Sequence, residues 1–286
     1  MDRLTDRLVD APSHKDAREL IAFYIDAGAD ALLGEEPVDR MADENPSPPI
    51  ASPSPATRDA TPAALSRKGV PSAEGRTFYQ SAAPPSPEAA VMAAREAAKS
   101  AGTLEELRAL LDTFEGCALR ATATRLVFAD GNPQSRVMFI GEAPGYDEDI
   151  SGKPFVGRSG KLLDLMMAAV GLDRSNVYIA NVVPWRPPGN RTPTPQETAI
   201  CLPFIRRQIE LANPDIMVCL GGPAMQTLLS IKEGITRSRG RWFPYDTGAR
   251  EIRALATFHP AFLLRSPLQK RFAWRDFLAL KKALAG

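Results

Sequence analysis

The stretch that decides the fold runs from Arg136 to Asp149 and reads Arg-Val-Met-Phe-Ile-Gly-Glu-Ala-Pro-Gly-Tyr-Asp-Glu-Asp. Its apolar run, Val137 to Ile140, lacks polar alternation, which is typical of a strand buried on both faces of a parallel sheet. The run stops at Gly141, and the proline and glycine that follow predict a tight turn. Ligands of open α/β sheets bind at the carboxyl ends of the strands. We therefore expect Glu142 at the mouth of a crevice.

Three further apolar runs predict strands at residues 177–183, 215–220 and 252–258. Helical patterns lie among them, and they are expected at residues 103–114, 161–170, 195 onwards, 224–229 and 274–285. Thr103 and Thr194 are suitable helix caps, and Thr194 has Pro195 after it and Glu197 three residues on. Strands that alternate with helices indicate an α/β fold with a mainly parallel, four-stranded sheet.

The chain before residue 88 differs in composition from the rest. Residues 17–33 carry an apolar stripe with helical spacing, so residues 1–41 are predicted to be a helical appendage. Ten of the 46 residues from 42 to 87 are proline, which predicts a disordered linker. The appendage either packs on the main domain or docks on a partner. Residues 88–286 are expected to form the catalytic domain.

Charge divides the chain in the same way, although the whole carries a net charge of only +1. Residues 1–114 hold 12 basic and 19 acidic side chains, a net of −7, and residues 115–286 hold 23 and 15, a net of +8. The basic body favours a polyanionic partner, with a solvated surface as the alternative. No apolar run reaches the ~20 residues of a membrane span. Three cysteines in 286 residues and a charged amino terminus indicate a reducing, cytoplasmic setting.

Polar side chains follow three of the predicted strands. Glu142 comes directly after the first, Asn181 interrupts the second, and His259 follows the fourth. A parallel sheet gathers such residues at one edge. A buried amide such as that of Asn181 needs hydrogen-bond partners, which either the fold or a ligand supplies. His259 is the one histidine in residues 88–286, so any catalytic imidazole of that region must be His259.

Loops near the same edge supply an aromatic ring and cations. Phe155 lies in a loop rich in glycine and proline, where its ring is either a local plug or a platform for a ligand. Arginines follow the strands at three places, namely Arg186 with Arg191, residues 237–241, and Arg265. A polar pocket ringed by cations suits a nucleic-acid base. The acids at 147–149 argue against a phosphate loop, and zinc-protease and serine-hydrolase motifs are absent from the sequence.

Five motifs together resemble the family-4 uracil-DNA glycosylases. They are Gly-Glu-Ala-Pro-Gly at 141–145, Lys-Pro-Phe-Val-Gly at 153–157, Asn-Val-Val at 181–183, Arg-Pro-Pro-Gly-Asn-Arg at 186–191 and His-Pro-Ala-Phe-Leu-Leu-Arg at 259–265. The resemblance extends from about residue 103 to the end of the chain. It implies a three-layer α/β/α domain that hydrolyses the N-glycosidic bond of uracil in DNA, either single- or double-stranded, for base excision repair.

The resemblance also implies roles for single residues. Glu142 would orient the attacking water or close the pocket, in whose wall Ala143 lies. Phe155 would stack on the flipped base, and Asn181 would read its edge. His259 would donate a hydrogen bond to uracil O2 as the base leaves. A loop with Leu263, Leu264 and Arg265 would enter the duplex, while Arg186 and Arg191 would contact DNA.

One feature of the resembling family is incomplete in this chain. The family usually holds a [4Fe–4S] cluster on four cysteines, of which Cys117 and Cys201 occupy the first and last places. Arg120 and Trp185 stand at the other two. Because two thiolates cannot supply four ligands, we expect no cofactor, with packing around Trp185 filling the space.

Three functions compete at this stage. The first is uracil excision by a monomeric enzyme that acts on DNA and not on membranes. The second is a non-catalytic protein that binds uracil-containing or single-stranded DNA. The third is a nucleotide-binding α/β domain, which would show affinity for ATP or a dinucleotide.

Overall fold

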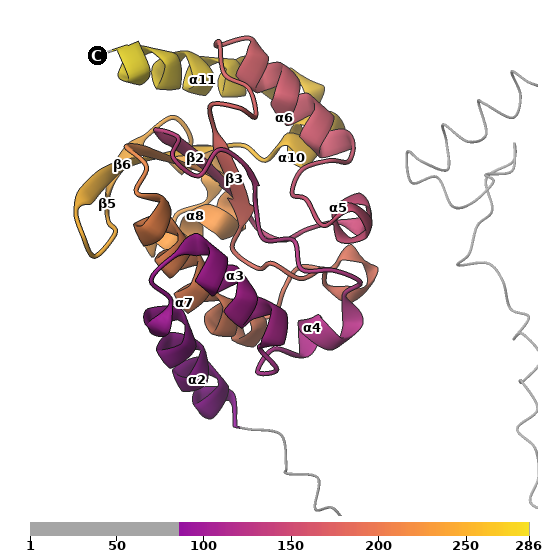
Figure 1. Cartoon of the computed structure of the whole chain (residues 1–286). Coiled ribbons are helices and arrows are strands. Elements are labelled where there is room, and N and C mark those ends of the chain that lie inside the picture. The colour runs from indigo at the N-terminus through magenta and orange to yellow at the C-terminus, as the bar shows by residue number, and fades with distance from the viewer. Residues whose placement is uncertain (1–85, 286) are drawn as a thin grey trace, which may run out of the picture. The chain divides into compact units, whose positions relative to one another are not determined.

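The computed structural model describes residues 86–285, and Figure 1 shows their arrangement. The predicted helix at 17–33 and the predicted linker up to residue 85 lie outside the described residues. Between residues 86 and 285, none of the helices combines the length and apolar character that a membrane span requires.

A six-stranded sheet forms the centre of the domain, with the strand order β1-β3-β2-β4-β6-β5. The strands are β1 (Asp130–Gly131), β2 (Val137–Gly141), β3 (Tyr178–Asn181), β4 (Ile216–Leu220), β5 (Trp242–Asp246) and β6 (Glu251–Thr257). The four central strands are parallel, as predicted, and β2 places Gly141 beside Asn181 of β3. Parallel pairing brings the carboxyl ends of these four strands to one edge of the sheet.

The two edge strands are antiparallel, and the sequence did not predict them. β1 has only two residues, Asp130 and Gly131. β5 contains Pro244, which donates no ladder hydrogen bond and is tolerated at a sheet edge. Neither segment has the fully buried pattern of β2 and β4. The four-stranded prediction therefore describes only the central part of the sheet.

Helices cover both faces of the sheet. The α-helices are α2 (Pro87–Ser100), α3 (Leu104–Thr113), α4 (Ala118–Thr122), α5 (Tyr146–Ser151), α6 (Arg158–Ala168), α7 (Pro195–Ala212), α8 (Gly222–Leu229), α9 (Ile235–Ser238), α10 (Pro260–Arg265) and α11 (Lys270–Ala285), with 3-10 turns at Pro188–Asn190 and Pro267–Gln269. In Figure 1, α6 and α11 lie on one side of the sheet and α2, α3 and α7 on the other.

Alternate strand residues point to the two helical layers, as β-strand geometry requires. Along β2, Met138 and Ile140 join the core beneath α2, α3 and α7, whereas Val137 and Phe139 join the core beneath α6 and α11. Each central strand therefore needs apolar residues at consecutive positions, which explains the uninterrupted runs of the sequence. The three-layer α/β/α architecture is confirmed.

Helix boundaries follow local capping chemistry. The side chain of Thr103 accepts a hydrogen bond from the backbone N–H of Glu106, and Thr194 forms the predicted capping box with Glu197. At the start of α2, Ser86 is the cap and Pro87 the first helical residue. Ser86 and Pro87, which the sequence assigned to the end of the predicted linker, thus begin the first helix that the structure describes.

Candidate active site

A cavity of about 610 Å³ opens at the carboxyl ends of the four parallel strands. Glu142, Asn181 and His259 all line it, together with Phe155 and Ala143. The loops after β2, β3, β4 and β6 form its walls, including Pro187–Pro193 and Leu220–Pro223. Three polar residues that are far apart in the chain, and that were predicted to gather at one edge of the sheet, thus line the same cavity.

Asn181 is the last residue of β3 and is almost fully buried. Its carboxamide oxygen Oδ1 has no hydrogen-bond partner within the described residues. An unpaired buried acceptor costs about 1–3 kcal/mol, so the fold leaves this atom unsatisfied at the wall of the cavity. The sequence left two alternatives open, and the described part of the fold does not supply a partner for the Oδ1 atom.

Gly141 makes room for this amide and for the Phe155 ring. A Cβ atom at Gly141 would lie 2.5 Å from Asn181 Oδ1 and 2.6 Å from Cζ of Phe155. The Phe155 ring also lies beside His259, with 5.5 Å between ring centroids. The aromatic ring therefore lies near both the amide and the imidazole, and all three side chains line the cavity.

His259 is held in one tautomer by its own helix. His259 is the N-cap residue of α10, and its Nδ1 atom accepts a hydrogen bond from the backbone N–H of Ala261 at 3.1 Å. In a neutral imidazole one ring nitrogen accepts and the other carries the proton, so Nε2–H is the donor. Burial, with a smaller effect of Arg265, lowers the pKa of His259 to about 4. Near pH 7 the cavity therefore contains a neutral imidazole with one N–H to donate.

Glu142 directly follows β2, and its backbone carbonyl accepts a hydrogen bond from Val183 N–H at 3.0 Å. Its side-chain oxygen Oε1 is buried and has no hydrogen-bond partner among residues 86–285. Burial raises the pKa of this carboxyl above its ordinary value. Such a carboxylate is a better proton acceptor than an exposed one, which suits a general base.

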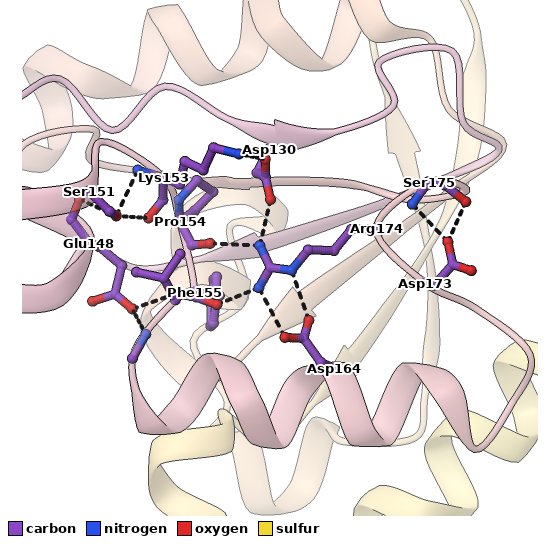
Figure 2. Close-up of polar contacts among 12 residues, drawn as sticks. Asp130, Glu148, Ser151, Lys153, Pro154, Phe155, Asp164, Asp173, Arg174 and Ser175 are labelled. Atoms are coloured by element: carbon purple, nitrogen blue, oxygen red, sulfur yellow. Dashed lines mark hydrogen bonds and ion pairs between the residues drawn. The ribbon is translucent and has the colours of Figure 1, made fainter.

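Two charged residues that the sequence argument did not assign hold the Phe155 loop. Glu148, in the acidic cluster, accepts hydrogen bonds from the N–H groups of Gly145, Val156 and Gly157. Arg174 donates to the carbonyl oxygens of Pro154 and Phe155 (Figure 2). Arg174 is 19 and 20 residues from the carbonyl groups that it binds, so no local motif marks it. Glu148 is three to nine residues from the N–H groups that it binds.

The predicted DNA-binding arginines near the cavity differ in their contacts. Arg186 donates to Oδ1 of Asn190 at 2.6 Å and lies over the ring of Tyr146 at 5.0 Å. Arg191 forms a bidentate ion pair with Glu197. Arg265 lines the cavity and has no ion-pair partner in the part of the chain that the structure describes. Arg265 is therefore the least neutralised of these three cations.

The segment after His259 is the helix α10 rather than the loop that the sequence suggested. Leu263 is only 1% exposed and packs against Phe258 and Ala273 in a small core. It cannot enter a duplex without unfolding that core, so its inclusion in the entering segment was wrong. Leu264 is 37% exposed.

The region of Cys117 and Cys201 is a packed core. Both thiols and Trp185 are buried in the same hydrophobic cluster, while the guanidinium of Arg120 donates to the carbonyl oxygen of Asp112. A hydrogen bond with Cys201 lowers the pKa of the Cys117 thiol. Within residues 86–285, no group of three or more His, Cys, Asp or Glu side chains is placed to hold a metal ion. This set of two thiols does not fit a four-thiolate cluster.

Comparison with known proteins gives consistent results. The family model described as "Uracil DNA glycosylase superfamily" matches residues 128–278. The type-4 uracil-DNA glycosylase of Archaeoglobus fulgidus is 40% identical over 165 residues, which cover 56% of this chain and 83% of the relative. The type-4 uracil-DNA glycosylase of Thermotoga maritima is 45% identical over 152 residues, which cover 52% of this chain and 77% of the relative. A type-5 uracil-DNA glycosylase of Mycobacterium tuberculosis is 29% identical over 202 residues, which cover 57% of this chain and 75% of the relative.

Proposed function

Because the chain belongs to the uracil DNA glycosylase superfamily, we propose that it excises uracil from DNA as the first step of base excision repair. Water attacks C1′ of the deoxyribose, the bond from C1′ to N1 of uracil breaks, and its electron pair leaves with the base. The products are free uracil and an abasic site. The observation that carries this proposal is the unpaired amide oxygen of Asn181 beside the Phe155 ring and the His259 imidazole.

Asn181 reads the base. Its Oδ1, which has no hydrogen-bond partner among residues 86–285, accepts the N3–H of uracil, and its NH₂ group donates to O4. Cytosine presents an acceptor at N3 and a donor at position 4, so both groups of the amide would be left unpaired. A site built to form hydrogen bonds rejects such a mismatch by about 10⁴–10⁵-fold.

His259 stabilises the leaving base. Its Nε2–H donates to uracil O2, where negative charge accumulates as the glycosidic bond breaks. A preorganised donor of this kind contributes about 10²–10³-fold in rate. The hydrogen bond from Ala261 to Nδ1 keeps the proton on Nε2, so the imidazole does not reorganise during the reaction.

Glu142 orients the attacking water and accepts its proton. The raised pKa of its buried carboxyl makes proton acceptance more favourable than it would be at an exposed glutamate. Phe155 stacks on the extruded base, an interaction worth about 1–3 kcal/mol. Ala143 is a small wall residue that leaves space for the ring.

DNA binds across the mouth of the cavity. Arg186, Arg191 and Arg265 surround the opening or its loops and contact phosphates. Leu264 faces solvent on α10 and fills the space that the flipped nucleotide leaves in the duplex. Flipping costs a few kcal/mol and less for a mismatched or single-stranded uracil, so both forms of DNA are substrates.

The enzyme acts as a monomer in the cytoplasm and requires no iron–sulfur cluster. The last point is supported by the two-thiol set and by the burial of Trp185 beside it. A protein purified without oxygen should show no absorbance band near 400 nm, and about four iron atoms per chain would contradict this part of the proposal.

A strand-break assay tests the main proposal. Pure protein is incubated with an oligonucleotide that holds one uracil, then treated with hot alkali, which cleaves abasic sites. We expect cleavage at the uracil, none for a cytosine control, and a loss of at least about a hundredfold for His259→Ala. Tight binding of the uracil strand without cleavage would instead establish a non-catalytic binder.

A further inference from the structure

The backbone of Phe155 adopts a conformation that its side chain does not favour. Its φ angle is +55°, in the left-handed region that residues other than glycine rarely occupy. Such a conformation persists only where the surroundings impose it. Helix α6 approaches closely here, because a Cβ at Gly160 would lie 1.7 Å from the Phe155 carbonyl oxygen.

Arg174 fixes the carbonyl side of this loop (Figure 2). Its Nη2 donates to the carbonyl oxygen of Phe155, and its Nη1 donates to that of Pro154 at 3.2 Å. Two carboxylates hold the guanidinium in turn, with Asp130 Oδ2 at 2.7 Å from Nη1 and Asp164 Oδ1 at 2.9 Å from Nε. A weaker bond at 3.5 Å joins Nη2 to Asp164 Oδ2. All five N–H groups of a guanidinium are thus committed.

Glu148 fixes the amide side of the same loop. Its Oε1 accepts the N–H groups of Val156 and Gly157, each at 2.9 Å. Its Oε2 accepts the N–H of Gly145 at 3.1 Å, in the loop that begins with Glu142. One anion and one cation therefore hold the peptide groups around Phe155 from opposite sides. Glu148 also lines the cavity, whereas Arg174 lies outside its lining.

We propose that Arg174 is a positioning residue, which with Glu148 sets the Phe155 ring at the height where it stacks on an extruded base. This proposal rests on the proposed function. Lysine is a poor replacement, because a single ammonium group on a flexible stem cannot bind the two carbonyl groups and the two carboxylates that Arg174 binds in fixed directions. Arg174 therefore acts on the reaction only through Phe155.

A double-mutant cycle tests this assignment. Single-turnover excision is measured with saturating enzyme for the wild type, Arg174→Lys, Phe155→Ala and the double variant. A displacement of about 1 Å in a site costs up to about a hundredfold. We expect Arg174→Lys to slow excision about ten- to a hundredfold in the wild-type background and less than about threefold in the Phe155→Ala background. Equal losses in both backgrounds would overturn the proposal.

Arg250→Lys is the matched control. Arg250 also donates to two backbone carbonyls, those of Asn213 and Pro214, and to the carboxylate of Asp215, and none of these residues lines the cavity. It should lower the thermal stability comparably and leave the excision rate within about twofold of the wild type. A rate loss like that of Arg174→Lys would mean that stability alone explains the effect.

Asp164→Asn provides a milder change should Arg174→Lys fail to fold. The Asp164 side chain is 45% exposed, and asparagine has nearly the same size, so the substitution weakens the hold on the guanidinium without leaving a cavity in the core. We expect about a threefold slower reaction, again absent with Phe155→Ala. An inactive wild type would refute the proposed function and this proposal with it. An active wild type with unaffected Arg174→Lys and Asp164→Asn would refute this proposal alone.

Discussion

Replacing Gly141 by alanine should damage the cavity with little change elsewhere. The added Cβ would lie 2.5 Å from Asn181 Oδ1 and 2.6 and 2.9 Å from the Phe155 ring. Non-bonded heavy atoms normally sit about 3.5–4.0 Å apart, so the amide and the ring must each retreat by about 1 Å. A 1 Å displacement of reacting groups costs up to about a hundredfold in rate. Overpacking of a buried strand costs a further ~1–3 kcal/mol of stability.

The assay is single-turnover release of uracil from a labelled oligonucleotide, measured well below the melting temperature of the variant. The matched control is Gly234→Ala, where the new Cβ would have no atom within 4 Å and which lies outside the cavity lining. We expect Gly141→Ala to react about a hundredfold more slowly and Gly234→Ala within about threefold of the wild type. A folded Gly141→Ala protein with wild-type rate would refute the reasoning, because the amide and the ring could then move without consequence.

Three further predictions concern single side chains. Asn181→Asp should reduce the uracil-over-cytosine preference by at least about a hundredfold while DNA affinity changes less than about threefold. In competition assays Asn176→Asp, at an exposed residue outside the cavity lining, should change neither, and an unaltered preference for Asn181→Asp would contradict the base-reading role. The pKa of His259 is about 4 in the folded protein and 6.5 in the unfolded chain. Between these values the unfolded chain binds more protons, so the free energy of unfolding of the wild type should fall by about 3 kcal/mol as the pH is lowered from 6.5 to 4. Urea titrations of His259→Gln should lack this component, and equal pH slopes for the two proteins would count against a buried neutral imidazole. Leu264→Ala should slow excision about tenfold from duplex DNA and less than about twofold from single strands, because only the duplex must be opened. Leu278→Ala, at a similarly exposed leucine of α11, should slow neither reaction. Equal losses on both substrates would argue against the insertion of Leu264 into the duplex.

The central strands and the site they carry were predictable because their signals are local. An apolar run that ends in a glycine marks a buried strand and its carboxyl end, as at Gly141. Asn181 interrupts the apolar run predicted as the second strand, and the structure ends β3 at this residue. Parallel pairing then brings such ends together whatever their separation in sequence. The cavity lined by Glu142, Asn181 and His259 follows from these two facts.

The remaining features depend on contacts that leave no local pattern. Arg174 lies 44 residues from Asp130 and 19 from Phe155, so its function is invisible in any short window. The left-handed backbone of Phe155 was equally hidden, because phenylalanine does not favour it. β5 was missed because an edge strand with Pro244 lacks the apolar run of a central strand. In each case tertiary contacts outweighed local preference.

The most direct test of the central claim is a crystal structure of the protein with free uracil. The claim is that the unpaired atoms at the strand ends are completed by a uracil ring. We predict electron density for the base against the Phe155 ring. The N3 atom of uracil should lie about 3 Å from Asn181 Oδ1, and its O2 atom should lie about 3 Å from His259 Nε2. Uracil bound elsewhere, or a cavity in which Asn181 Oδ1 pairs with a protein group instead, would contradict the account.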